Sequence, residues 1–177
     1  MSTPAPQPDP WLRGPVANVP ALLQPFAHAF IAAREDIDRA TAGIGPDELW
    51  ARPRDVASVG FQLAHLAGST DRLLTYARGE ALSQSQRANL VRERAIADAR
   101  PNAKELLTAL RETLRRAQEQ LAVTDESTLT QPRAVGRAQV ASTVLGLLFH
   151  AAEHAARHAG QIVTTAKLVR EGGALPR

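Results

Sequence analysis

Three histidines recur at every fourth residue near the C-terminal end of the chain, at His150, His154 and His158. Residues four apart stay on one face of an α-helix, because each such step rotates the position by only ~40°. The neighbouring positions on this face are mostly apolar, which predicts that the imidazoles point inward: Leu147, Ala151, Ile162 and Thr165. A buried imidazole needs partners for both ring nitrogens. Three of them on one apolar face are hard to satisfy without a metal ion.

A single ion cannot bind all three of these histidines. At a rise of 1.5 Å per residue, His150 and His158 lie ~12 Å apart along the helix axis, whereas metal–nitrogen bonds are only ~2.0–2.1 Å long. The ion therefore takes one i,i+4 pair, and the spacing leaves both pairs open because they share His154. The third ligand must come from another helix, and His65 is the histidine at the middle of another predicted apolar face. His28 lies off the apolar stripe of its helix and is expected at the surface.

The segment from His150 to His154 also matches the motif H-x-x-E-H, in which both histidines bind zinc and the glutamate acts as the base. Enzymes with this motif need a further ligand well downstream, and the chain continues only to Arg177. An i,i+4 ion pair between Glu153 and Arg157 on the outer face of the helix explains the glutamate more simply.

Prolines and glycines divide the chain into the elements that must position these residues. Apolar residues at steps of three and four predict four long helices, from Pro20 or Pro25 to Ala42, Ser58 to Arg78, Asn102 to Ala122 and Val140 to Arg170. Two long connections separate them, residues 80–101, with a short helix at about 86–97, and residues 123–139. This pattern predicts an all-α fold, a four-helix bundle with a long crossover connection.

The N-terminal segment differs in composition from the rest of the chain. Five of the twelve prolines lie in residues 1–15, so residues 1–17 are predicted to form a flexible Pro-rich arm. Residues 18–177 are predicted to form one helical domain, since a chain of 177 residues can bury a sizeable core.

Composition excludes several classes of function. The chain has no cysteine, which excludes disulfides, thiolate nucleophiles and zinc–thiolate sites; a thiol in any reaction must therefore come from the substrate. The net charge of +3 is spread along the chain, so nucleic-acid binding is not expected. No apolar run approaches the ~18 residues of a membrane span, and residues 1–10 lack the features of a secretory signal. A cytoplasmic location is expected.

Two segments of the chain resemble the DinB/YfiT-like superfamily. They are residues 61–76, FQLAHLAGSTDRLLTY, and residues 150–162, HAAEHAARHAGQI, which has the pattern H-x-x-x-H-x-G-Q. The resemblance covers about residues 18–171 and implies a four-helix bundle with a crossover, a three-histidine metal site and a homodimer. Carried over by position, the ligands are His65, His154 and His158, and His150 is an additional histidine outside the set. Gly160 agrees with this choice, because a glycine permits close approach of a neighbouring helix or ligand.

The resemblance also implies a range of functions. Members resemble metal-dependent thiol S-transferases, thiol-dependent isomerases or hydrolases, so a metal-dependent enzyme with a small-molecule substrate, such as a thiol, is expected. Three imidazoles suit zinc, nickel or iron(II) and leave coordination positions open. The alternatives are a non-catalytic metal-binding or stress-related interaction protein on the same bundle, and a helical dimer with a vestigial site.

Four further residues are candidates for supporting roles around the metal. Gln62 and Gln161 lie nearly one turn from His65 and His158 and are candidates for a second shell around the ion, and His150 is a candidate for the pocket wall. Arg72, two turns beyond His65, is a candidate for contact with an anionic substrate, with an ion pair as its alternative. Tyr76 is expected to pack at the edge of the core.

Overall fold

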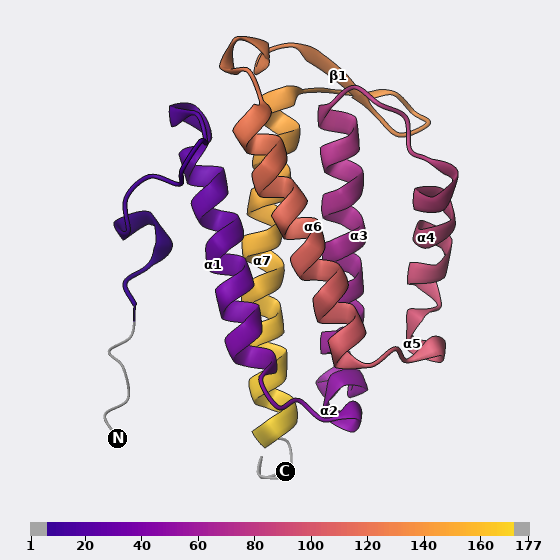
Figure 1. Cartoon of the computed structure of the whole chain (residues 1–177). Coiled ribbons are helices and arrows are strands. Elements are labelled where there is room, and N and C mark those ends of the chain that lie inside the picture. Colours follow the sequence, from indigo (N-terminus) through magenta and orange to yellow (C-terminus); the bar gives the residue numbers. More distant parts are fainter. Residues whose placement is uncertain (1–6, 172–177) are drawn as a thin grey trace.

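The computed structural model describes residues 7–171 as a mostly helical chain (Figure 1). Its four long helices are α1 (Gln24–Thr41), α3 (Val59–Ala77), α6 (Ala103–Val123) and α7 (Val144–Glu171). Helix α7 packs against α1 and α3, and α6 packs against the same two helices. The four helices therefore lie side by side and enclose a common core.

Shorter elements connect these helices. They are the helices α2 (Pro46–Trp50), α4 (Gln84–Arg94) and α5 (Ile96–Ala99), the 3-10 turns η1 (Pro10–Leu12), η2 (Ala21–Leu23), η3 (Pro53–Asp55) and η4 (Glu126–Thr128), and the strands β1 (Pro132–Val135) and β2 (Val140–Thr143). Helix α4 stands beside α3, at the edge of the molecule away from α1 (Figure 1). The predicted short helix in the crossover is thus present. No helix between residues 7 and 171 is long and apolar enough to cross a membrane.

The ends of the long helices follow capping rules that are visible in the sequence. The Ser58 hydroxyl accepts a hydrogen bond from the Phe61 amide at the start of α3, as an N-cap serine does. Asn102 and Glu105 form a capping box at the start of α6. Pro25 lies in the first turn of α1, where its missing N–H costs nothing.

The core consists of the apolar faces of all four long helices. Its largest fully buried side chains on these helices are Phe30 and Ile37 of α1, Leu63 and Leu66 of α3, Leu110 and Leu121 of α6, and Leu148 and Ile162 of α7. Burying each such side chain contributes about 1.5–3 kcal/mol. Because α3 and α7 are anchored in this core along their lengths, residues on their adjoining edges are held in a defined relation to one another.

The predicted start of the last helix at Val140 is wrong. Residues 140–143 form strand β2, which pairs with β1 in an antiparallel hairpin with Val135 opposite Val140. Gly136 and Gln139 adopt positive φ angles in the connecting turn. Helix α7 begins only at Val144, and the hairpin crosses one end of the long helices (Figure 1). The fold is therefore mostly helical with a small sheet, and not purely α.

The described part of the N-terminal arm contacts α1. Residues 1–6 lie outside the described residues. In the remainder, Pro10 is buried, and the Arg13 guanidinium donates hydrogen bonds of 2.7 and 2.8 Å to the two carboxylate oxygens of Glu35. His28 Nε2 lies 3.0 Å from the carbonyl oxygen of Gly14. These contacts hold residues 7–17 against α1; the flexibility of the arm stays a prediction.

Replacing Leu148 with alanine tests the contribution of the core. This side chain of α7 is fully buried, so its truncation should lower the free energy of unfolding by about 2–5 kcal/mol in urea titrations. Leu145→Ala is the matched control on the same helix, because Leu145 is 38% exposed and should cost clearly less. Equal losses in the two variants would contradict the packing described.

Candidate metal centre

The structure brings His65 of α3 together with His154 and His158 of α7. One ring nitrogen of each histidine lies within 4.8 Å of the corresponding nitrogens of the other two. The ring centroids of His65 are 5.2 and 5.0 Å from those of His154 and His158, which are 4.4 Å from each other. Two nitrogens on one ion lie at most about 4 Å apart, twice the ~2.0–2.1 Å bond length. Small ring rotations are therefore enough for all three to contact one ion.

The local sequence explains why these three rings meet. His154 and His158 are one helical turn apart, so both project from the same side of α7. Alanines are buried at positions 151, 155 and 159 of α7, and their small side chains let neighbouring helices approach closely. On α3, Leu63 and Leu66 are fully buried and flank His65 in the sequence, which fixes the face of that helix that meets α7.

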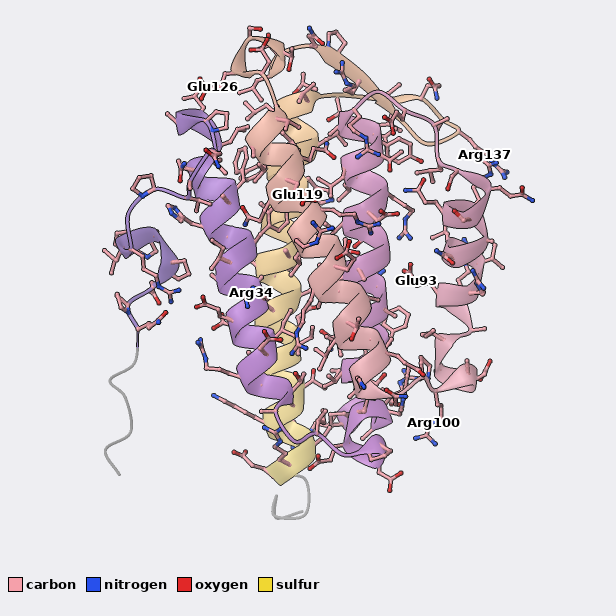
Figure 2. All side chains as sticks on the ribbon, viewed as in Figure 1. Arg34, Glu93, Arg100, Glu119, Glu126 and Arg137 are labelled. Atoms are coloured by element: carbon pink, nitrogen blue, oxygen red, sulfur yellow. The ribbon has the colours of Figure 1, made fainter. Side chains whose placement is uncertain are left out.

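Glu93 of α4 contacts His65, which the sequence analysis did not anticipate. Its Oε1 lies 2.6 Å from His65 Nδ1, and its Oε2 accepts a hydrogen bond of 2.9 Å from the Arg72 guanidinium. Figure 2 shows Glu93 between α4 and α3. Burial raises the pKa of the Glu93 carboxyl, but hydrogen bonds from His65 and Arg72 outweigh burial and leave the pKa lowered. The carboxylate is ionised, and His65 keeps its Nε2 free.

Arg72 is therefore not a free cation. Its side chain is 13% exposed and its charge is balanced by Glu93. Arg72 forms an ion pair, as the second of the two expectations for this residue stated. The pair with Glu93 is largely buried and does not lie at the surface. Contact between Arg72 and an anionic substrate stays a prediction.

The two histidines of α7 are held in their neutral form. Burial, followed by the charges of neighbouring histidines and Arg157, lowers the pKa of His154 to about 4. Burial, followed by His65 and Arg157, lowers the pKa of His158 to about 4. Both rings are therefore neutral at pH 7, which is the form that binds metal ions.

Hydrogen bonding distinguishes the ring nitrogens available in this cluster. His154 Nδ1 lies 3.3 Å from the Ser69 hydroxyl. His158 Nδ1 is buried and has no hydrogen-bond partner within the described range, 7–171. Leaving a buried polar atom unpaired costs about 1–3 kcal/mol, so this atom is one that a ligand would satisfy. The three-imidazole donor set and this unpaired nitrogen fit a transition-metal ion.

His150 lies outside the cluster. Its side chain is 51% exposed, and its Nδ1 is 3.6 Å from a carboxylate oxygen of Glu153. Glu153 forms an ion pair with Arg157, which is the simpler of the two explanations considered for this glutamate. The described residues thus bring His65, His154 and His158 together; the His150 ring centroid lies 5.6 Å from that of His154, but His150 is not part of this group.

The two predicted glutamines differ in their surroundings. Gln62 is buried, and its Nε2 donates hydrogen bonds to the Ala57 carbonyl and to the Thr165 hydroxyl of α7; it links α3 to α7 near the site. Gln161 is exposed. Gly160 is also exposed, and a Cβ atom there would meet no atom within 4 Å. The close approach predicted at this glycine does not occur within the described chain. Tyr76 packs against the core as expected.

The lowered pKa values predict how the metal-free protein responds to acid. An unfolded histidine binds protons with a pKa near 6.5, whereas folded His154 and His158 bind them only near 4. Between these values the unfolded state binds more protons, so stability falls as the pH falls from about 6.5 to 4. Thermal unfolding with chelator present should show a shallower fall for the double variant His154→Gln/His158→Gln. The same pH dependence in both proteins would contradict the burial described.

The chain was compared with known proteins. A sequence model of the DinB superfamily matches residues 29–162, a span that contains all three clustered histidines and most of the four long helices. The comparison with curated proteins gave no match. Because the matched span covers well over half of the chain, the protein belongs to the DinB superfamily.

Proposed function

We propose that the protein is a metal-dependent enzyme of the thiol S-transferase or hydrolase kind. In this proposal the four long helices form a four-helix bundle with a crossover, and His65, His154 and His158 hold one zinc, nickel or iron(II) ion. The observation that supports it best is the meeting of three imidazoles within 4.8 Å, of which two have a pKa near 4. When bound, such an ion with open coordination positions lowers the pKa of a thiol or water and polarises carbonyl groups.

The charges around the cluster favour an anionic partner for the ion. The two nearest carboxylates, Glu93 and Glu153, are each paired with an arginine, Arg72 and Arg157. Since His154 and His158 are neutral and both carboxylates are paired, the protein leaves much of the charge of the proposed ion uncompensated at this point. A substrate that supplies an anionic ligand, such as a thiolate, would complete the charge balance. The absence of cysteine is consistent with a thiol brought by the substrate.

Other side chains of the chain orient the ligands and bound the site. Glu93 and Ser69 contact the Nδ1 atoms of His65 and His154, as partners of metal-ligating histidines usually do. The Phe61 ring stacks on His65 at a centroid distance of 5.8 Å and covers one face of that ring. His150 lies exposed one turn from His154 and is positioned to contact a substrate at the rim.

The alternative is a non-catalytic metal-binding or stress-related interaction protein. A structural metal site is usually closed by four protein ligands. Here three histidines form the cluster among residues 7–171, and the His65 side chain is 28% exposed. A site with three ligands and a route to solvent favours the enzyme.

Alanine variants of the four histidines test this proposal. In calorimetric titration with zinc, His65→Ala, His154→Ala and His158→Ala should each lose stoichiometric binding, because two imidazoles hold an ion poorly, and His150→Ala should retain it. The metal-loaded wild type should accelerate conjugation of a low-molecular-weight thiol to a chromogenic electrophile, or hydrolysis of an activated ester, and His158→Ala should not.

Two results would count against the proposal. Equal rates for metal-loaded and chelated wild type would favour the non-catalytic alternative. Full zinc binding by His158→Ala together with its loss in His150→Ala would overturn the ligand assignment and favour the H-x-x-E-H interpretation.

We also propose that the protein is a homodimer. Large apolar side chains are exposed near the start of α7, at Leu22, Leu145 and Phe149, and the Phe149 ring contacts Phe26 of α1 edge-on. Exposed apolar patches often mark an interface, and a second copy of the chain with two-fold symmetry would cover this one. Light scattering should give twice the monomer mass, and Phe149→Asp should shift it toward the monomer. A wild-type monomer at high micromolar concentration would refute the dimer.

A further inference from the structure

Helix α4 is attached to the rest of the protein mainly by polar side chains. No residue of Gln84–Arg94 is buried, although all of this helix is described. Gln86 Nε2 donates hydrogen bonds to Asp71 Oδ2 and Thr75 Oγ1 near one end of α4, and Glu93 contacts His65 near the other end. The second of these attachments ends on one of the three clustered histidines. The crossover and the candidate metal centre therefore share a contact.

Gly68 makes room for that contact. It lies in the middle of α3, where a glycine is less favourable than alanine by about 0.5–1 kcal/mol. A Cβ atom at this position would lie 2.7 Å from Glu93 Oε2 and 2.8 Å from Arg72 Nη1, so the ends of these two flexible side chains would have to shift from their present positions. The glycine thus gives the Glu93 carboxylate a place on the surface of α3 from which it reaches both His65 and Arg72.

We propose that Glu93 is a positioning residue of the metal centre and couples metal binding to the docking of α4. The inference rests on the proposed three-histidine site. With its carboxylate on Nδ1, Glu93 selects the tautomer of His65 and orients its ring, so that Nε2 is presented beside His154 and His158. Outer hydrogen-bond partners of this kind typically change metal affinity by 10–100-fold.

The coupling acts in both directions. If a docked α4 increases the affinity of the site for a metal ion, the bound ion must favour the docked α4 by the same factor. The physical link is the single hydrogen bond between Glu93 and His65, because an ion on Nε2 draws charge from the ring and makes Nδ1–H a stronger donor. Metal loading should therefore reduce the opening of a helix that has little buried surface of its own.

Glycine and glutamate variants separate this role from a purely structural one. Zinc affinity would be measured by competition with a chromogenic chelator, for wild type, Gly68→Ala and Glu93→Ala. Glu93→Ala should bind zinc about 10–100-fold more weakly, and Gly68→Ala should bind it measurably more weakly than wild type, because the Glu93 carboxylate must shift relative to His65. Gly68→Ala should at the same time unfold at an equal or higher temperature without metal, because alanine favours the helix. In Gly68→Ala the zinc affinity should thus fall while the unfolding temperature does not. A variant that merely folds poorly would lose both.

Two matched controls accompany these variants. Gly160→Ala makes the same change in α7, where a Cβ meets open space, and Glu119→Ala removes a carboxylate exposed on α6; both should bind zinc as the wild type does. Hydrogen exchange gives a second readout: zinc should slow exchange of the α4 amides in wild type and leave them unchanged in Glu93→Ala, with α6 as internal reference.

Each result has a defined meaning. Wild-type zinc affinity in both Gly68→Ala and Glu93→Ala, or zinc binding by wild type without any change in α4 exchange, would overturn the role of Glu93 and leave the three-histidine site standing. Failure of wild type itself to bind zinc, nickel or iron(II) would overturn the proposed function and this inference together.

Discussion

The packing of α3 against α7 is the constraint on which the candidate site depends. Neither helix alone can bring three imidazoles to one point, since α7 offers two usable histidines and α3 offers one. Core side chains such as Leu66 and Ile162 hold the helices together, and burial at their adjoining edges keeps His154 and His158 neutral, with pKa values near 4. The same burial leaves His158 Nδ1 without a partner in the described part of the chain. The fold thus bears the cost of burying two neutral imidazoles, one with an unpaired nitrogen, which a bound ion would offset.

The carboxylates near the three histidines are already neutralised by other side chains. Both carboxylates that approach the histidines are paired with arginines, Glu93 with Arg72 and Glu153 with Arg157. One of these pairs spans from the crossover helix α4 to α3, and the other lies along α7. Because neither carboxylate is free, an anion that completes the charge balance of the proposed metal centre would come from outside the chain. Through Glu93, the segment between α3 and α6 thus influences the chemistry proposed for the site.

Much of this arrangement follows from periodicity, and the remainder depends on tertiary contacts. The i,i+4 spacing of His154 and His158, the apolar face around His65, and the helix starts near Ser58 and Asn102 are local features, so the sequence analysis placed them correctly. Val140 to Thr143 continue an apolar pattern that fits a helix, and only pairing with Pro132 to Val135 makes them a strand. Glu93 could not be identified, because its partner His65 is distant in the sequence and α4 has no apolar face to indicate which side meets α3. Ser69 was within reach of the same reasoning, since it lies one turn after His65 on α3.

X-ray absorption at the zinc K-edge of the zinc-loaded protein tests the central claim, that His65, His154 and His158 together hold one ion. The account predicts scattering from three imidazoles with zinc–nitrogen distances of about 2.0–2.1 Å, and loss of this three-imidazole signal when zinc is added to His65→Ala. A wild-type spectrum dominated by carboxylate oxygens, or one with fewer than three imidazoles, would contradict the account.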